Sequence, residues 1–173
     1  MSLSRRHILA ALMLAPLAGC GFEPLYGTGS AASELRGQIR VTAIDGRDGY
    51  FLRERLLQRF GTPAANAPLT LTVTLVTESE PLSITQSNDI TRYNLSGAAT
   101  ISLRNAGMAA PVLEDVLTGD ASYNAPSSIA PAAPTASAIA AREAEQNAGR
   151  RLAEYLAEQI ADRVLIASEL LSQ

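Results

Sequence analysis

Side chains that commonly perform acid, base or nucleophilic chemistry are scarce in this sequence. Among its 173 residues the only histidine is His7, the only cysteine is Cys20, and lysine is absent. If a leader is removed before residue 20, no histidine remains for a Ser-His-Asp or Cys-His site, and no lysine can form a Schiff base. Histidine or cysteine ligands for zinc are missing as well. Chemistry on the mature chain is thus restricted to carboxylates, and we expect no metal and no cofactor.

Neighbouring carboxylates could act as the general acid and base of a hydrolase. The candidates are Glu78 with Glu80 and Glu114 with Asp115. Carboxylates close together on strands are ordinarily exposed charges, and adjacent strand residues point to opposite faces. We therefore predict that the protein is not an enzyme, and a hydrolase stays as an alternative hypothesis.

Cys20 closes a segment with the features of a bacterial export signal. Arg5 and Arg6 precede an apolar run at residues 8–17, which is far shorter than the roughly 20 residues that a spanning helix needs. Residues 17–20, Leu-Ala-Gly-Cys, resemble the bacterial lipobox, in which the cysteine is acylated and the bond before it is cut. We predict a signal peptide at residues 1–19 and a lipid such as palmitate on Cys20. The arginine pair fits either the general secretory or the twin-arginine export route.

A lipid on Cys20 would attach the mature chain to a membrane. Each buried methylene contributes about 0.8 kcal/mol, so several acyl chains anchor a protein firmly without a spanning helix. Gly21 follows the cysteine. In the sorting pattern familiar from enterobacteria an aspartate at this place retains a lipoprotein in the inner membrane, so Gly21 favours the outer membrane.

The charge balance argues against nucleic acid as a partner. The whole chain carries a formal net charge of −3, and loss of the positive Arg5 and Arg6 with the leader makes it −5. Nonspecific binding to nucleic acid depends on clustered Lys and Arg that neutralise phosphates. An acidic mature chain does not supply such a surface.

Alternation of apolar and polar residues predicts the strands. There are four such segments, near residues 39–43, 69–75, 92–104 and 113–123. Pro81, Ser87, Asn88 and Asp89 indicate a turn between the second and third segments, which would form a long antiparallel hairpin. The Ala-, Pro- and Ser-rich residues 126–134 are predicted to be a loop.

Apolar residues at helical spacing predict two helices. Asp48 is predicted to cap the first, which ends at Gly61, and the second runs from residue 135 or 137 to about residue 171. The second helix repeats apolar residues every four positions, at Ala148, Leu152, Leu156, Ile160 and Val164. The order β-α-β-β-β-α predicts an α+β fold, with two helices packed on one face of a mostly antiparallel four-stranded sheet. This single domain covers residues 35–173 and follows a lipidated flexible tether at residues 20–34.

Three arginines on the first helix allow two interpretations. Arg53, Arg55 and Arg59 could form a basic site for an anion. Because Glu54 lies among them, a solvated outer face of the helix is the favoured interpretation.

The start of the mature chain resembles a known family. Residues 20–27, Cys-Gly-Phe-Glu-Pro-Leu-Tyr-Gly, are similar to the Cys-Gly-Phe-x-Pro-Leu-Tyr-Gly start of LptE, the lipopolysaccharide-assembly lipoproteins, in their alphaproteobacterial form. Residues 89–95 and 119–123 resemble the central strands of that family, and the long Ala-, Glu- and Arg-rich C-terminal helix agrees with it. The family's fold, helices on one side of a four-stranded sheet, matches the order predicted above.

The resemblance implies a noncatalytic role in transporting lipopolysaccharide to the cell surface. Members of the family act as a plug inside LptD, a large outer-membrane β-barrel, and help that barrel to assemble. The resemblance therefore implies LptD and lipopolysaccharide as partners, and a place on the periplasmic side of the outer membrane within the barrel lumen. The alternative is another envelope assembly or secretion lipoprotein that acts as a barrel-associated scaffold.

Two arginines are candidates for binding lipopolysaccharide. Family members are thought to use basic side chains on loops at the far end of the sheet, but residues 81–89 contain no Lys or Arg. Arg92 and Arg104, at the two ends of one predicted strand, are the nearest candidates. Their alternative interpretation is that they are ordinary solvated residues of a strand.

Overall fold

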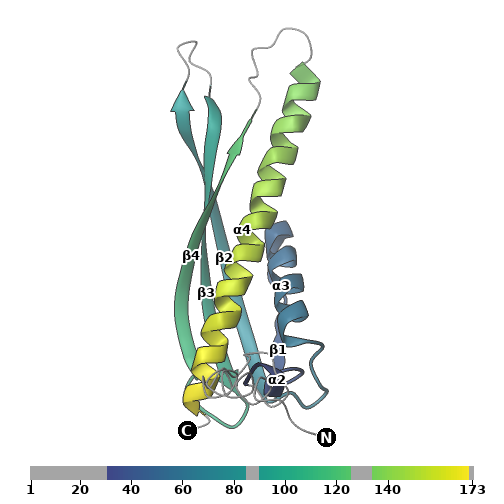
Figure 1. Ribbon diagram of the computed structural model, residues 1–173, viewed down its shortest axis with the longest axis vertical. Helices are drawn as coiled ribbons and strands as arrows, with labels where there is room; N and C mark the ends of the chain where they lie inside the picture. Colours follow the sequence, from purple (N-terminus) through teal and green to yellow (C-terminus); the bar gives the residue numbers. More distant parts are fainter. Residues whose placement is uncertain (1–30, 85–89, 126–133, 172–173) are drawn as a thin grey trace, which may run out of the picture.

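The computed structural model describes residues 31–84, 90–125 and 134–171. Its elements are α2 (Ala31–Glu34), β1 (Ile39–Val41), α3 (Gly46–Phe60), β2 (Leu69–Ile84), β3 (Ile90–Asn105), β4 (Leu113–Asn124) and α4 (Pro134–Leu171). The molecule is elongated, with α4 running along the sheet and α3 beside the lower half of α4 (Figure 1). After the short α2, the order β-α-β-β-β-α is the predicted one.

The four strands form one sheet in the order β1-β2-β3-β4. The pairs β2–β3 and β3–β4 are antiparallel, as predicted, whereas β1 pairs in parallel with the start of β2, Ile39 opposite Leu69. Parallel neighbours need a crossover connection, and α3 supplies it by returning the chain to the end where β1 began. The sheet is therefore mixed, with one short parallel edge.

The hydrophobic core lies between α4, α3 and one face of the sheet. Every fourth residue of α4 from Ala148 to Val164 is at most 1% exposed, which confirms the predicted stripe. On β3, Ile101 and Leu103 are buried, while Thr100 before them and Arg104 after them are exposed. The sheet thus has one apolar face under the helices and one outer face with polar side chains.

Two glycines allow α4 to approach the sheet closely. Gly97 on β3 and Gly119 on β4 are opposite each other in the register. A Cβ atom at Gly97 would lie 2.9 Å from Cδ2 of Leu152, and one at Gly119 would lie 2.9 Å from the ring of Tyr155. A larger residue at either position would require the side chain of Leu152 or Tyr155 to move.

The first helix begins earlier than predicted. Asp45, in an extended conformation, precedes α3, whereas Asp48 lies inside its first turn, so the prediction of Asp48 as the cap is wrong. Acidic residues are favoured both at the cap and in the first turn, where the helix dipole attracts them, so the sequence signal does not separate the two places. Asp48 packs against Gly149 of α4, and burial raises the pKa of its carboxyl group.

Strand β2 is longer than predicted, because it continues through Pro81 to Ile84. Only Leu69–Leu71 pair with β1, so the rest of β2 is an edge strand, where proline is tolerated. The register with β3 shifts directly after Pro81. The predicted loop at residues 126–133 lies outside the described residues, and residues 31–34 at the end of the predicted tether form α2.

Replacement of Leu156 by alanine tests the packing of α4. Leu156 is fully buried, so removing most of its side chain should lower the free energy of unfolding by about 2–5 kcal/mol. Urea denaturation of the purified domain measures this change. Ile166→Ala on the same helix is the control, since Ile166 is 54% exposed and its truncation should change stability by less than about 0.5 kcal/mol. Equal midpoints for the two variants would contradict the assignment of the buried face.

Candidate functional site

The predicted lipid anchor precedes the folded part of the chain. Cys20 and the signal peptide lie outside the described residues, which begin at Ala31 in α2. Among the helices that the structure describes, none combines the length and the apolar character required to span a membrane.

Arg92 and Arg104 occupy opposite ends of β3. Both are exposed and both lie on the outer face, but twelve residue steps along the strand separate them, which corresponds to roughly 40 Å. Arg104 has its Nη2 atom 4.0 Å from Oε1 of Glu114. Arg92 pairs in register with Asn124 and forms no salt bridge within the described part of the chain. The two arginines therefore cannot bind one phosphate group together.

A cleft opens near Arg92, between the start of α4 and the sheet, and is called here the distal cleft. Its volume is about 660 Å³, and its lining residues are Ser79, Tyr93, Tyr123, Ala125, Ala138, Ala141, Arg142 and Glu145. The rings of Tyr93 and Tyr123 are stacked, with centroids 5.2 Å apart, and the hydroxyl groups of Ser79 and Tyr123 lie 3.0 Å apart. The distal cleft thus combines aromatic and methyl surface with one arginine, Arg142, and one carboxylate, Glu145.

Arg142 is the functional candidate that the sequence did not single out. It is exposed and forms no salt bridge with any residue that the structure describes. On an Ala- and Glu-rich helix an arginine is ordinarily a solvated residue, so its type and spacing carry no signal. Arg142 becomes a candidate only in the folded protein, because the packing of α4 on the sheet places it opposite the tyrosine pair.

The arginines of α3 do not form an anion site. Glu158 of α4 lies between Arg55 and Arg59, with Nε–Oε distances of 2.6 and 3.1 Å, and Arg59 also approaches Asp162 at 3.6 Å. Arg53 makes no salt bridge within the described residues. The anion-site hypothesis is therefore wrong for Arg55 and Arg59, whose charges are neutralised by α4 and link the two helices.

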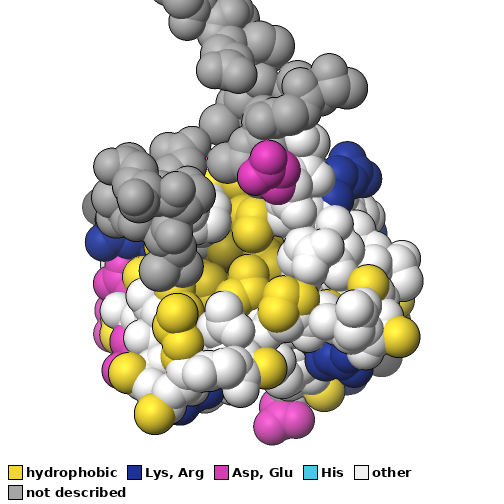
Figure 2. Space-filling view, turned by 90° about the horizontal axis from the view of Figure 1, so that it is seen from below, with side chains coloured by type: hydrophobic (Ala, Val, Ile, Leu, Met, Phe, Trp, Pro, Cys, Tyr) yellow, Lys and Arg dark blue, Asp and Glu magenta, His cyan; other side chains and the backbone are white. Residues whose placement is uncertain are grey.

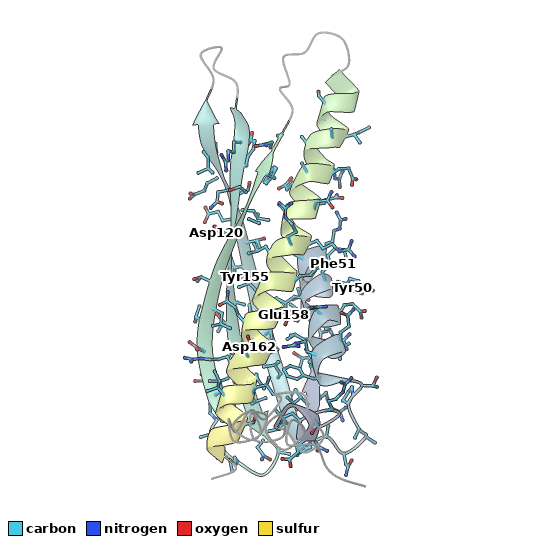
Figure 3. All side chains as sticks on the ribbon, in the orientation of Figure 1. Tyr50, Phe51, Asp120, Tyr155, Glu158 and Asp162 are labelled. Atoms are coloured by element: carbon cyan, nitrogen blue, oxygen red, sulfur yellow. The ribbon has the colours of Figure 1, made fainter. Side chains whose placement is uncertain are left out.

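These ion pairs border a groove between the outer surfaces of α3 and α4, called here the interhelical groove. Tyr50 and Tyr155 are 58% and 54% exposed and line it together with Phe51 (Figure 3). The guanidinium group of Arg150 lies 4.8 Å from the ring centroid of Phe51, a favourable cation–π distance. The groove is rich in aromatic and arginine side chains, which are common in protein interfaces.

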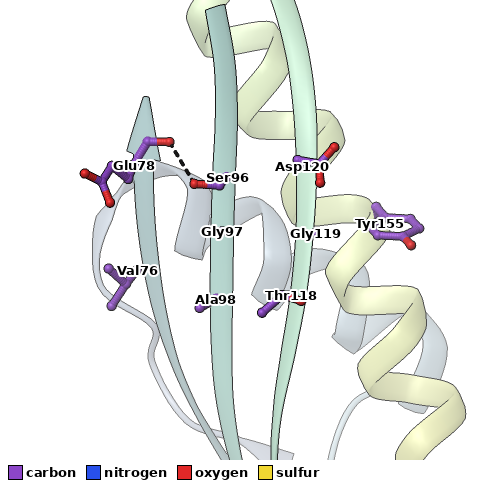
Figure 4. A pocket seen from close by; sticks show the side chains of 9 residues that line it. All are labelled: Val76, Glu78, Ser96, Gly97, Ala98, Thr118, Gly119, Asp120 and Tyr155. Carbon is purple, nitrogen blue, oxygen red and sulfur yellow. Dashed lines mark hydrogen bonds between the residues drawn. The ribbon is translucent and has the colours of Figure 1, made fainter. Parts of the chain in front are cut away.

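The outer face of the sheet carries a shallow trough of about 510 Å³. Small side chains of β3, Ser96 and Ala98, lie at its bottom, with Glu78 on β2 and Asp120 on β4 at its sides (Figure 4). The Ser96 hydroxyl donates a hydrogen bond to the backbone oxygen of Glu78, 3.3 Å away. The trough offers polar groups and two carboxylates, with no positive charge among its lining residues.

The carboxylates proposed for a hydrolase are not arranged as a catalytic pair. Glu78 and Glu80 are exposed on the edge strand β2. Glu114 and Asp115 point to opposite faces of β4 and approach different arginines, Glu114 facing Arg104 and Asp115 facing Arg163. In the described ranges no three His, Cys, Asp or Glu residues gather as ligands for a metal ion.

Asp115 is instead a contact between the sheet and α4. Its Oδ2 atom lies 2.6 Å from Nε of Arg163, and its Oδ1 atom accepts a hydrogen bond from the backbone N–H of Val116. The hydrogen bond from Arg163, followed by that from Val116, holds the pKa of Asp115 below its usual value of 3.8. The ionised carboxylate is the form that the folded protein favours.

Replacement of Asp115 by asparagine should therefore destabilise the protein in a pH-dependent way. A lowered pKa in the folded state contributes stability above the ordinary pKa and loses it as the pH falls through the folded pKa. The wild type should have the higher melting temperature at pH 7, and the difference should shrink below about pH 4. Asp120→Asn on the outer face of the same strand is the control, because Asp120 forms no ion pair within the described residues. A difference that stays constant down to pH 3 would contradict this ion pair.

Comparison with known proteins identifies the family. The family model described as LptE, Lipopolysaccharide-assembly, matches residues 32–164. The chain belongs to the LptE family. The match extends from α2 into α4, so it includes the whole sheet and the distal cleft of this LptE domain. The resemblance found at residues 20–27 is thereby confirmed from a different part of the chain.

Solved structures share the fold of this LptE domain. A Caulobacter crescentus CB15 protein is 25% identical with a TM-score of 0.54, covering 84% of this chain and 98% of that chain. Rare lipoprotein B from Shewanella oneidensis is 14% identical with a TM-score of 0.55, covering 78% and 98%. A minor lipoprotein from Acinetobacter baumannii is 14% identical with a TM-score of 0.52, covering 76% and 93%. A search of curated protein sequences finds no match.

Proposed function

We propose that the mature chain is a noncatalytic lipoprotein of the outer membrane, anchored through Cys20, which plugs the LptD β-barrel and assists lipopolysaccharide transport. Membership of a lipopolysaccharide-assembly family is the observation that carries this proposal. The anchor, the barrel partner and the place within its lumen are the finer parts of the proposal. A barrel-associated scaffold for another assembly pathway is the alternative.

The outer face of the sheet supports a plug in a water-filled barrel. Its exposed side chains are mainly short and polar, among them Thr72, Thr74, Thr100 and Thr118. The interior of a wide outer-membrane barrel is polar, so such a face can exchange hydrogen bonds with water for hydrogen bonds with the barrel wall. Glu78 and Asp120 at the trough would meet donors on that wall.

The length of the domain supports the same proposal. β2 and β3 have 16 residues each, which at about 3.3 Å per residue corresponds to roughly 50 Å. The apolar band of an outer-membrane barrel is only about 25 Å tall. The hairpin is therefore long enough to pass through the lumen and to reach beyond it at either end.

The distal end of the domain is the part that we assign to lipopolysaccharide. Arg92 on the outer face and Arg142 at the distal cleft lie at this end of the sheet, without salt bridges in the described part of the chain. Guanidinium groups bind phosphates through paired hydrogen bonds, and the tyrosines and alanines of the cleft offer apolar surface beside them. Arg104, at the opposite end and facing Glu114, is the weaker of the two arginines predicted from the sequence.

Depletion of the protein tests the transport role. If the chain supports barrel assembly, its depletion should lower the amount of mature LptD and the amount of surface lipopolysaccharide together. Both can be followed by immunoblotting and surface labelling, and an epitope on the lipoprotein should recover LptD after mild detergent extraction. Recovery of a different barrel, with normal surface lipopolysaccharide after depletion, would favour the alternative scaffold.

Arginine variants test the ligand site on purified protein. Arg92→Gln with Arg142→Gln should weaken lipopolysaccharide binding by roughly tenfold at low salt, the loss of about one charge-assisted contact. Titration with labelled lipopolysaccharide at two ionic strengths measures this, and the difference should shrink at high salt. Arg104→Gln is the matched control, on the same strand and face as Arg92. Equal weakening by the control would contradict the distal location.

A further inference from the structure

The turn between β3 and β4 is an apolar segment of the described surface. Residues 106–112 read Ala-Gly-Met-Ala-Ala-Pro-Val, and none of these side chains carries a charge or a hydrogen-bond donor. Residues 106–110 are exposed, and the side chain of Met108 is 54% exposed. In contrast, residues 85–89, which connect β2 and β3 along the chain, are Thr-Gln-Ser-Asn-Asp. The two connections between antiparallel strands therefore differ in their composition.

Four backbone N–H groups of this turn, those of residues 106, 107, 108 and 112, are hydrogen-bonded inside the protein. Ala106 donates its N–H to Pro68 O, Met108 to Asn105 O and Val112 to Leu103 O, at 2.7–3.0 Å. The N–H of Gly107 lies 3.2 Å from Oδ1 of Asn105, and proline at residue 111 has no N–H. Unsatisfied backbone groups are costly in an apolar medium, so these four N–H groups add no such cost, and the turn's carbonyl groups can stay hydrated at the polar level of a lipid interface.

The turn lies at the end of the molecule that contains α2, where the described residues begin, and we call this end the base. The base also contains α2 and the last turns of α4 (Figure 1). Viewed from this end, apolar side chains gather across the centre of the surface (Figure 2). Ile166 near the end of α4 is 54% exposed, and the first charged side chains beside the turn are Arg104 and Glu114.

The tether keeps the base near the predicted anchor. Eleven residue steps separate Cys20 from Ala31, the first residue of α2. At about 3.3–3.6 Å per residue, the fully extended tether would reach at most roughly 40 Å. A lipid on Cys20 would thus hold the base, rather than the distal end, close to the bilayer.

We propose that the base is a membrane-contact surface, in which residues 106–112 enter the lipid interface beside the acyl anchor. Met108 supplies the largest apolar side chain of the turn. The occupant is a lipid surface because the turn lacks polar groups for recognising a protein and lies within reach of the lipidated residue. This inference rests on the acylation of Cys20 and adds a second, noncovalent contact beside the acyl anchor.

Fluorescence of the full acylated chain in vesicles tests the inference. Once Cys20 is acylated, Met108→Cys provides a single free thiol for an environment-sensitive dye. The vesicles contain phosphatidylethanolamine and phosphatidylglycerol, with or without acyl chains brominated near the headgroup. Ile139→Cys is the matched control, because Ile139 is 61% exposed on the distal part of α4.

The dye at residue 108 should shift its emission to the blue and lose intensity with brominated lipid, whereas the dye at residue 139 should respond only to aqueous quenchers. Flotation of the wild type with vesicles, and its loss in Cys20→Ala, is measured first. If the wild type does not float, the anchor is absent and the inference fails with it. If it floats while residue 108 behaves like residue 139, the membrane contact alone is refuted and the apolar turn is free for a protein partner.

Discussion

The contact between α4 and the sheet is the interaction on which the rest of the structure depends. The apolar stripe of α4 covers one sheet face, and the glycine pair Gly97–Gly119 lets Leu152 and Tyr155 approach the strands. Because burial of apolar surface is the main favourable term in folding, this contact stabilises both layers. α3 is then positioned largely by α4, through the packing of Asp48 beside Gly149 and the ion pairs of Glu158.

This contact also leaves two surfaces with different chemistry. The apolar stripe of α4 covers the inner face of the sheet. The outer face, which carries Thr, Ser and Asn, therefore stays exposed and can contact the polar inner wall of a barrel such as the proposed partner. Near its start α4 still borders the sheet, but Ala138, Ala141 and Arg142 face Tyr93 and Tyr123 across the distal cleft instead of a filled core. The helix that stabilises the domain at its centre therefore shapes its candidate ligand site at one end.

The two proposed lipid contacts lie at opposite ends of the elongated domain, the membrane contact at the base and the lipopolysaccharide site at the distal end. The base carries the start of the folded chain and the apolar turn at residues 106–112, and the distal end carries Arg92 and Arg142. Antiparallel strands place successive turns at opposite ends of the sheet, so this separation follows from the topology. A domain held at its base by lipid can present its distal arginines to an anionic lipid without moving its own core.

The sequence alone determined the order of the elements, the fold class and the family resemblance. Periodicity reports burial residue by residue, so the stripe of α4 and the alternation of β3 were readable before any packing was known. The sequence predicted the ends of elements less well. Asp48 was predicted to be a helix cap, but acidic residues are also favoured inside the first turn, where it lies. Pro81 was predicted to mark a turn, but proline is also tolerated on an edge strand such as β2. Only the tertiary structure brought Arg104 near Glu114, paired Arg55 with Glu158 and placed Arg142 at a cleft. These outcomes depend on which distant residues meet, and spacing along the chain does not contain that information.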